Sequence, residues 1–340
     1  MRKTIVTLVA FCAAMTANAT ILRVSNVNGS SAPYSSIQDA HDAASAGDTI
    51  MVDGSNTRDG LTEVSKKLVF IGPGFWINEN GLVQESAPSA IAEFLIKASA
   101  AGTVIEGFTF KYEMTQLLTI NADNCVVRRC YFWNHGGYVA IGFSRDKVDD
   151  TYSGPNPTGG VIHQNFFADC GIVSGFLKDE EGDLNGMMTN VQITNNIFLK
   201  NDGTEYDICN FSNCYIAYNT MIGSGTWKNF RTVHASTIEH NIVKEAKSSY
   251  SNIHIADNNE WADNIEVGVA DREIEYQTDK DVFDLELIKS YRDNYGAFAG
   301  DSPYVLSGIP AAPVIEDLVV PTTVEAGSKM NVTIKVGIQK

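Results

Sequence analysis

The chain has 340 residues, and its 25 Lys and Arg against 41 Asp and Glu give a formal net charge of −16. Such an acidic chain is a poor nucleic-acid binder, because affinity for the phosphate backbone comes from Lys and Arg. It is also a poor partner for a polyanionic sugar, unless a cation or a local basic cleft bridges the two.

The N-terminus has the pattern of a secretory signal peptide. Met1-Arg2-Lys3 is basic, residues 4–15 are apolar, and Ala17-Asn18-Ala19 is a small-residue cleavage site. We therefore predict a signal peptide over residues 1–19 and export to the periplasm, the cell surface or the outside of the cell. Removal of Arg2 and Lys3 changes the net charge from −16 to −18. No later segment is apolar enough to span a membrane.

The first predicted elements after the signal are a strand over Ile21–Val24 and a short helix over residues 35–48. Ser35 and Gln38 have the spacing of a capping box, and Gly47 is a helix stop. The apolar stripe of this helix consists of Ile37, Ala40 and Ala44. A stack of repeats has an open apolar end that must be covered, so we expect this helix to cap the N-terminal end.

A six-residue phrase recurs through the middle of the chain. It is found at residues 162–167, 193–198, 216–221 and 238–243, with a weaker copy ending at Ile265 and two copies without the Asn at 105–110 and 127–132. Equivalent positions from Phe108 to Asn264 are separated by steps of 22, 35, 31, 23, 22 and 23 residues. Apolar and polar residues alternate on both sides of the Asn, which is the period of a strand. A period of roughly 20 to 50 residues is typical of stacked repeats.

The phrase predicts a parallel β-helix with one coil per repeat. We expect the Asn to sit at a bend, because Asn tolerates the left-handed region, and to bond the same Asn one coil away, about 4.8 Å off. The Ile before the Asn and the apolar residue after it are predicted to point inward. The predicted aromatic stack consists of Phe110, Phe132, Phe167 and Phe198.

The cysteines of the mature chain are five in number: Cys125, Cys130, Cys170, Cys209 and Cys214. An odd number of scattered cysteines does not indicate a disulfide framework. Cys125 and Cys214 share a phase of the repeat but lie about three coils, or roughly 14 Å, apart, which is too far for a disulfide. We therefore expect all five cysteines to be free thiols that pack in the core as small buried side chains.

The helix sequence SIQDAHDAASAGDTIMV, the following Ile71-Gly72-Pro73-Gly74 and the Asn phrase resemble right-handed parallel β-helix proteins of the pectin-lyase-like superfamily. The resemblance covers roughly Ile21 to Val267 and implies the fold. It does not imply one activity, because that superfamily contains lyases, hydrolases, esterases and non-enzymatic proteins. The polygalacturonase and pectin methylesterase motifs are missing, so no catalytic residue is carried over.

Two long repeat steps predict loops that leave the scaffold from neighbouring coils. The first spans residues 144–160 and the second spans 178–190. Long loops on a regular scaffold usually carry function. Carboxylate oxygens are ligands for Ca²⁺, and the predicted metal ligands are Asp149, Asp150, Asp179, Asp183 and Asp207. The alternative is a solvated acidic loop that holds no ion.

Basic residues on the first strand of each coil are the candidate catalytic groups. We predict that Arg231, His254 and Asp207 project outward, one coil apart from one another. In β-elimination of a polysaccharide, a Lys, Arg or His takes the C5 proton while a cation neutralises the carboxylate. The alternative is a surface ladder of charges. A similar row of Glu106, Arg128 and His163 on the second sheet is interpreted as salt bridges at the surface.

Aromatic and basic residues near these loops are the candidate sugar-binding groups. Tyr138, Tyr152 and Trp227 are predicted to stack on sugar rings, with Lys178 beside them. Exposed aromatics also pack under loops, so a structural role is the alternative.

The C-terminal end follows a different pattern from the repeats. Residues 282–295 have mixed helical character, and residues 303–310 predict an extended closing segment. Residues 311–340 contain two strand-like runs, Ile315–Val320 and Lys329–Val336, and are too few for an independent domain. We predict a β tail.

These patterns together predict an all-β chain: a right-handed parallel β-helix over residues 20–310, with an N-terminal capping helix and a short β tail over 311–340. The predicted function is a secreted, monomeric, glycan-directed protein acting as a Ca²⁺-assisted lyase on a uronic-acid polysaccharide of plant or host origin. The alternative is a non-catalytic β-helix that binds glycan or another surface component. No nucleic acid and no membrane span are expected.

Overall fold

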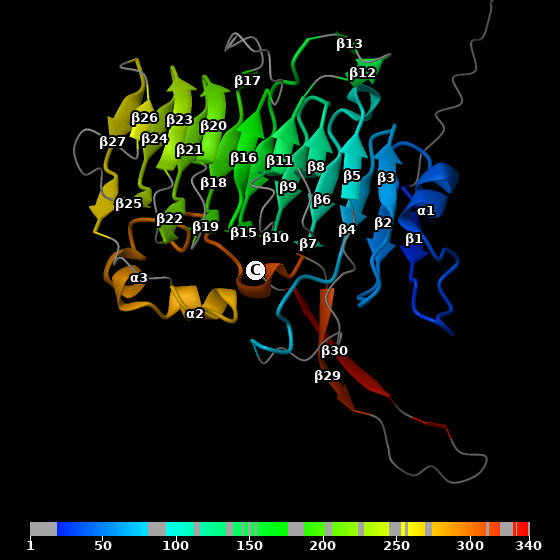
Figure 1. The fold of residues 1–340 in the computed structure, drawn as a ribbon. Coiled ribbons are helices and arrows are strands. Elements are labelled where there is room, and N and C mark those ends of the chain that lie inside the picture. Colours follow the sequence, from blue (N-terminus) through cyan, green and yellow to red (C-terminus); the bar gives the residue numbers. More distant parts are fainter. Residues whose placement is uncertain are drawn as a thin grey trace, which may run out of the picture.

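The computed structural model describes residues 19–80, 93–111, 116–133, 139–144, 146–148, 151–153, 155–175, 187–200, 206–223, 228–244, 253–255, 258–268, 274–310, 313–319, 329–330 and 332–338. Three long parallel sheets dominate these residues, and the helices are few and short (Figure 1). The structure thus confirms the prediction of an all-β chain with parallel strands and is compatible with a parallel β-helix. The predicted signal peptide falls almost entirely on residues 1–18, outside the described residues.

The ten-stranded sheet runs the length of the described molecule. Its strands are β1 (Ile21–Val24), β2 (Thr49–Val52), β4 (Val69–Ile71), β6 (Val104–Glu106), β9 (Val126–Arg128), β14 (Val161–His163), β18 (Gln192–Thr194), β21 (Tyr215–Ala217), β24 (Thr237–Glu239) and β27 (Glu260–Ala262). Every neighbouring pair for which the register is known is parallel.

Two further parallel sheets complete the architecture. The seven-stranded sheet contains β7 (Thr109–Lys111), β10 (Tyr131–Trp133), β15 (Phe166–Ala168), β19 (Ile197–Lys200), β22 (Thr220–Gly223), β25 (Ile242–Lys244) and β28 (Ile265–Val267). The nine-stranded sheet contains β3 (Leu61–Val64), β5 (Glu93–Ile96), β8 (Gln116–Ile120), β11 (Val139–Phe143), β16 (Gly171–Ser174), β17 (Met188–Thr189), β20 (Tyr206–Ser212), β23 (Lys228–His234) and β26 (Ile253–Ile255). From β6 onward the chain visits the ten-, seven- and nine-stranded sheets in that order; we call one such passage a circuit.

The repeated phrase supplies the core between the three sheets. The Ile that lies three residues before each ladder Asn is fully buried, as at Ile193 and Ile216. The aromatic stack is confirmed: the ring centroids of Phe110 and Phe132 are 4.7 Å apart, and the next two steps along the stack measure 5.0 and 4.6 Å. All five cysteines are buried and free, as predicted.

The asparagine ladder is also confirmed. Asn165, Asn196, Asn219 and Asn241 are fully buried, and each Nδ2 donates to the Oδ1 of the next at 2.9–3.0 Å, ending on Asn264. Their conformation was predicted wrongly, because the left-handed residue is the one that precedes each Asn. Each ladder Asn accepts through its Oδ1 from the backbone amide and the side chain of the Asn one circuit earlier, as Asn196 does from Asn165, and the bend falls on the preceding residue.

The N-terminal helix α1 spans Ile37–Ala43, which is shorter than predicted. Its N-cap is Ser36, whose Oγ accepts from the Asp39 amide at 3.1 Å, so the predicted capping role of Ser35 is wrong. The stripe of Ile37, Ala40 and Ala44 is buried in the main core, and the helix lies at the N-terminal end of the stack (Figure 1). The capping function follows from this burial.

Substitution of Ile37 tests the capping role. Because Ile37 is fully buried, we expect Ile37→Asp to detach the helix and to lower the free energy of unfolding by about 2–3 kcal/mol, the value of one buried aliphatic side chain. The exposed end of the sheets then offers unpaired edges, and the variant should aggregate. Light scattering and thermal melting measure both effects. A soluble variant with a wild-type melt would show that the helix is dispensable.

A second apolar cluster covers the outer face of the seven-stranded sheet. The strands contribute Tyr131, Phe166, Ala168, Ile197, Leu199, Ile222, Ile242 and Val267. They are covered by Val282 of α2 (Asp279–Phe283), Ile288 of α3 (Glu286–Tyr291) and Tyr304. Figure 1 shows both helices lying beside this sheet. This face is therefore closed to a large ligand.

Residues 294–310, here called the return segment, run back along the stack in the reverse order of the circuits. The Gly296 amide donates to the carbonyl of His240, Asn195 Nδ2 donates to Ala299 O at 2.9 Å, and Arg129 Nη1 donates to Ile309 O at 3.0 Å. The predicted closing segment thus lies lengthwise on the molecule, rather than across its end. At Gly107, with φ +75°, a Cβ would approach Pro310 to 2.7 Å, so only glycine fits under the segment.

The tail forms an antiparallel hairpin of β29 (Pro313–Val319) and β30 (Thr333–Ile338), which extends away from the three sheets (Figure 1). This confirms two paired strands near the predicted runs. Within the described chain, no helix has the length and hydropathy that a membrane span requires.

Candidate functional site

Arg231 of β23 is the predicted site residue that the structure places on an accessible surface. Its side chain is exposed, and its guanidinium carbon lies 5.0 Å from the ring centroid of Tyr206, a cation–π contact. The backbone register pairs Arg231 with His254 of β26, so the two predicted catalytic positions are neighbours on the nine-stranded sheet. The side chain of His254 lies outside the described residues.

Asp207 does not belong to this row. The register places Cys209, not Asp207, opposite Arg231. Asp207 is fully buried at the start of β20, where its Oδ2 accepts from Asn229 Nδ2 at 2.8 Å. Asn229 in turn accepts from the backbone amide of Lys244 at 2.9 Å. The expected outward projection is therefore wrong, because this position falls at the corner between the nine- and seven-stranded sheets, where the carboxylate binds another side chain.

The other predicted ligands and sugar-binding residues lie outside the described residues: Asp149, Asp150, Asp179, Asp183, Tyr138, Trp227 and Lys178. Part of the first loop is a short antiparallel hairpin of β12 (Asp146–Val148) and β13 (Thr151–Ser153). The backbone of Tyr152 belongs to β13, and its side chain is not described.

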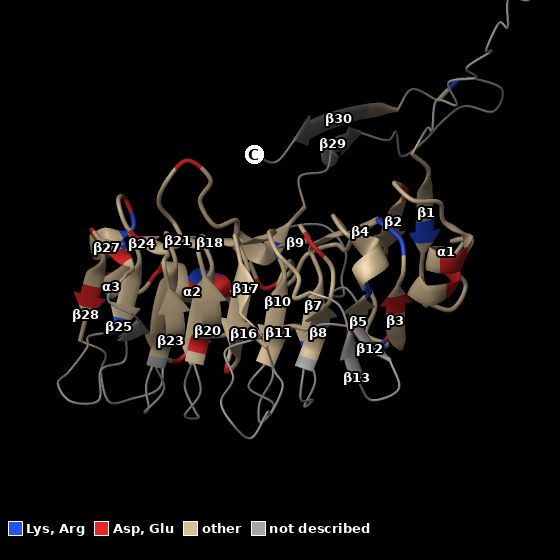
Figure 2. Ribbon diagram, turned by 90° about the horizontal axis from the view of Figure 1, so that it is seen from above, with Lys and Arg blue, Asp and Glu red and all other residues tan. Residues whose placement is uncertain are grey.

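Acidic side chains are spread over the described surface. Figure 2 marks acidic positions on α1, β3 and β28, which belong to different parts of the stack, and also on β20, where Asp207 is buried. Among the described residues, no three His, Cys, Asp or Glu side chains come together as a metal-binding group. Ca²⁺ binding thus stays a prediction about the loops.

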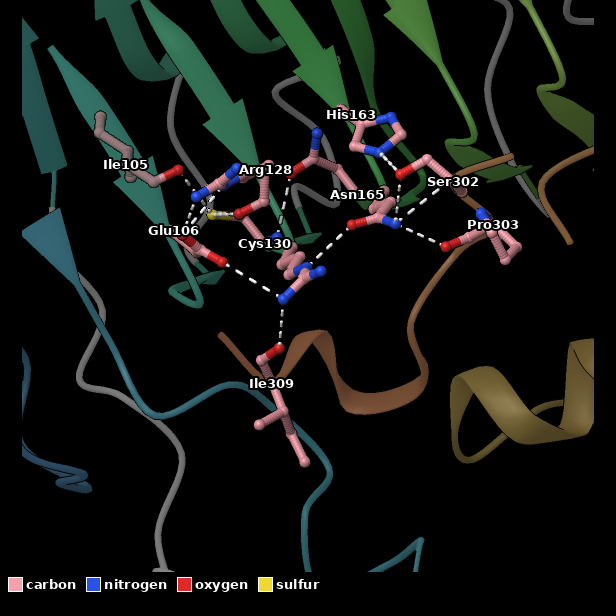
Figure 3. A network of polar contacts seen from close by, with 11 residues as sticks. Ile105, Glu106, Arg128, Cys130, His163, Asn165, Ser302, Pro303 and Ile309 are labelled. Atoms are coloured by element: carbon pink, nitrogen blue, oxygen red, sulfur yellow. Dashed lines mark hydrogen bonds and ion pairs between the residues drawn. The ribbon is translucent and has the colours of Figure 1, made fainter. Parts of the chain in front are cut away.

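The row of Glu106, Arg128 and His163 crosses three neighbouring strands of the ten-stranded sheet, as predicted. Arg128 Nη2 lies 2.7 Å from Glu106 Oε2 and Arg129 Nη1 lies 3.5 Å from Glu106 Oε1, so one buried carboxylate pairs with two guanidinium groups (Figure 3). The interpretation as a salt bridge is confirmed for Glu106 and Arg128. It does not describe His163, which has other partners.

His163 connects the ten-stranded sheet to the return segment. Its Nε2 lies 3.0 Å from Ser302 Oγ, while its Nδ1 lies 3.1 Å from the carbonyl oxygen of Thr194 and 2.8 Å from Thr194 Oγ1 (Figure 3). Burial, followed by the positive charges of Arg129 and Arg128, lowers the pKa of His163 to about 4. The imidazole is therefore neutral near pH 7.

Arg129 and Gln164 hold the return segment and were missed by the sequence analysis. Arg129 Nε donates to Gln164 Oε1 at 2.8 Å, and Gln164 Nε2 donates to the carbonyls of Ser302 and Pro303 (Figure 3). Both residues are the left-handed ones directly before a ladder position. The position directly before the ladder residue of each repeat is the sequence signal that would have identified Arg129 and Gln164.

A buried carboxylate fixes the start of helix α2. Asp279 Oδ2 accepts from the Ser307 amide at 2.6 Å and from Tyr304 Oη at 2.9 Å, and its Oδ1 accepts from Asn80 Nδ2 at 2.7 Å. Burial raises the pKa of Asp279 to about 6, although these hydrogen bonds act in the opposite direction. Asp279 thus joins helix α2 to two remote segments, the one with Asn80 and the return segment.

Comparison with known proteins gives no family model, no curated protein and no solved structure that matches this chain. The site must therefore be argued from its own residues.

Proposed function

We propose that the protein is a secreted right-handed parallel β-helix of the pectin-lyase-like kind that acts on a glycan. The observation that carries the proposal is Arg231, an exposed cation beside the ring of Tyr206 and in register with His254. An aromatic ring stacks on a sugar face, while a neighbouring guanidinium pairs with a carboxylate. The outer face of the seven-stranded sheet is covered, which leaves the nine-stranded sheet as the better binding surface.

The proposed reaction is β-elimination of a uronic-acid polysaccharide. His254, or Arg231 in its neutral guanidine form, takes the C5 proton, and the leaving oxygen departs from C4 as the double bond forms. Ca²⁺ held by the acidic loops would neutralise the uronate carboxylate and so favour loss of that proton. The ion would also reconcile an acidic protein with an acidic substrate.

The alternative proposal is glycan binding without catalysis. Tyr206 and Arg231 suffice for a binding surface, and only a lyase needs a cation next to the basic group. The two functions differ in one product, the unsaturated sugar.

The test incubates the protein, without its signal peptide, with a panel of uronic-acid polysaccharides, with and without Ca²⁺. We expect ultraviolet absorbance of an unsaturated product that depends on Ca²⁺. Arg231→Ala should lower the rate about 100-fold or more, the contribution of one general acid–base group. Arg23→Ala is the matched control, because Arg23 is an exposed arginine of β1 at the far end of the stack. Binding without product would favour the non-catalytic alternative, and no binding to any member would refute both.

The loops themselves are tested by a Ca²⁺ titration followed by thermal melting. If Asp149 and Asp183 belong to one site, Ca²⁺ at 100 times its Kd stabilises the fold by about 2.7 kcal/mol. The Asp149→Ala/Asp183→Ala double variant should lose this shift. A wild-type melt that does not respond to Ca²⁺ would remove the ion and the lyase mechanism.

A further inference from the structure

The contact between Ser302 and His163 has the geometry of an activated serine. The hydroxyl lies 3.0 Å from Nε2 of the imidazole, and the opposite ring nitrogen is held by Thr194. A hydroxyl, a base within hydrogen-bond reach and a third group that orients the base are the three parts of nucleophilic catalysis by serine. Ser302 is exposed, so a substrate can reach its Oγ.

The orienting contact decides which nitrogen is the base. The carbonyl oxygen of Thr194, 3.1 Å from Nδ1, can only accept, and Thr194 Oγ1 at 2.8 Å is able to accept as well, so we assign the ring proton of His163 to Nδ1. Nε2 then has a lone pair that faces Ser302, and the hydroxyl proton points to it. The partly buried imidazole is neutral near pH 7 for the reasons given above.

Attachment of the return segment does not account for this pair. Gln164 already binds the carbonyls of Ser302 and Pro303, and Arg129 binds that of Ile309. These carbonyl contacts would persist with any residue at position 302, whereas Gln164 Nε2 also donates to Ser302 Oγ at 3.5 Å, which leaves the hydroxyl proton to His163. The contact of Ser302 Oγ with His163 is an additional one on the accessible side.

Two guanidinium groups give the surroundings a positive charge. Arg128 of β9 is the register partner of His163 of β14 on the ten-stranded sheet, and the side chain of Arg128 is 42% exposed. Arg128 and Arg129 both act on the imidazole electrostatically. They favour a negative charge nearby, either on the carbonyl oxygen of a tetrahedral intermediate or on an acidic sugar. The negative charge of an acidic sugar would also offset the positive charges of Arg128 and Arg129, which disfavour the imidazolium form of His163.

We propose that Ser302 and His163 form an esterase site that removes O-acyl groups from an acidic glycan. Ser302 Oγ attacks the ester carbonyl carbon and its proton passes to His163 Nε2. The bond between the acyl carbon and the sugar oxygen then breaks, and the sugar oxygen takes the proton from Nε2. Water attacks the acyl-serine in the same way, releasing the carboxylic acid and restoring the hydroxyl. The acyl-transfer chemistry is inferred from the geometry of Ser302 and His163 alone, whereas the choice of a glycan as the substrate rests on the proposed function.

The experiment uses a fluorophosphonate probe, an aryl acetate and an O-acetylated uronic-acid polysaccharide. We expect the probe to label Ser302, identified by peptide mass, and the protein to release acetate from both esters. Ser302→Ala should abolish labelling and lower both rates about 100-fold or more. His163→Gln keeps hydrogen-bonding groups but cannot act as the base, and should lower the rates similarly. Ser290→Ala is the control, because Ser290 is an exposed serine whose Oγ donates to a backbone carbonyl.

The outcomes separate the two proposals. Equal labelling of wild type and Ser302→Ala, with a change only in the melt, would show a structural contact and overturn the esterase. Hydrolysis of the aryl acetate but not of the polysaccharide would overturn the glycan substrate. Ester hydrolysis that depends on Ser302, in a protein that forms no unsaturated product, would support the esterase and count against the lyase alone.

Discussion

Replacement of Asn219 by leucine is expected to lower the free energy of unfolding by about 3–5 kcal/mol, since several buried groups each lose a partner worth about 1–3 kcal/mol. Asn219 is fully buried, and its Nδ2 donates to Ile193 O at 2.8 Å and to Asn241 Oδ1 at 3.0 Å. Its Oδ1 accepts from both the amide and the side chain of Asn196. Leucine satisfies none of these groups, and no water can replace the lost partners in so tight a stack.

Gln192→Leu is the matched control for this variant. It makes the same change from amide to isobutyl at an exposed position of β18, and it should move the melt little. Chemical denaturation of both variants measures the difference. A loss below about 1 kcal/mol for Asn219→Leu would mean that the ladder adds nothing beyond one ordinary hydrogen bond.

The ladder and the aromatic stack could be predicted because the repeat makes neighbours of residues one step apart. A fixed phrase such as that around Asn196 brings like side chains together wherever the strands pair in register. The capping helix was predictable for a related reason, since Ile37 and Ala40 form one apolar stripe. Both signals are periodic and local.

An extended closing segment could be predicted, but its course along the stack could not, because its partners are far away in the sequence. Arg129 meets Ile309, and Asn195 meets Ala299, across separations of 180 and 104 residues. The phrase itself does carry a partial signal. The residue before each ladder position adopts a left-handed conformation, as at His240, and its side chain or carbonyl is turned outward to the segment.

The candidate site was predictable only in part, for the same reason. Arg231 and His254 lie in adjacent circuits at the same register, which the repeat length indicates. Asp207 has the same apparent phase, but it lies two positions before Cys209, the true neighbour of Arg231. A shift of two residues along a strand keeps the side-chain parity, so alternation alone cannot reveal it.

Asp279 gives the other large expected effect, a dependence of stability on pH. The pKa of this carboxyl is about 6 in the folded protein, against 3.8 for a free aspartate, because the group is buried. Between these values the folded state binds more protons than the unfolded state, so stability falls as the pH rises from about 4 to about 6. The difference of about two pKa units corresponds to about 3 kcal/mol, lost in full above pH 6.

Asp279→Asn should remove this dependence, so that the variant is about 3 kcal/mol more stable than wild type at pH 7.5 and similar to it near pH 4. The new amide needs one acceptor, and Asn80 Oδ1 is a buried oxygen without a hydrogen-bond partner among the described residues. A rotation of the Asn80 amide provides this acceptor and keeps the hydrogen bonds from the Ser307 amide and Tyr304 Oη, at the loss of the bond from Asn80 Nδ2 to Ser307 Oγ. Asp301→Asn, an exposed carboxylate of the return segment, is the control for the loss of one charge. The measurement is denaturation of wild type and Asp279→Asn at several pH values. If the free energies of unfolding of the two proteins change with pH in parallel, the pKa of Asp279 is the same in the folded and unfolded states. The link between α2 and the return segment would then not depend on protonation of this carboxylate.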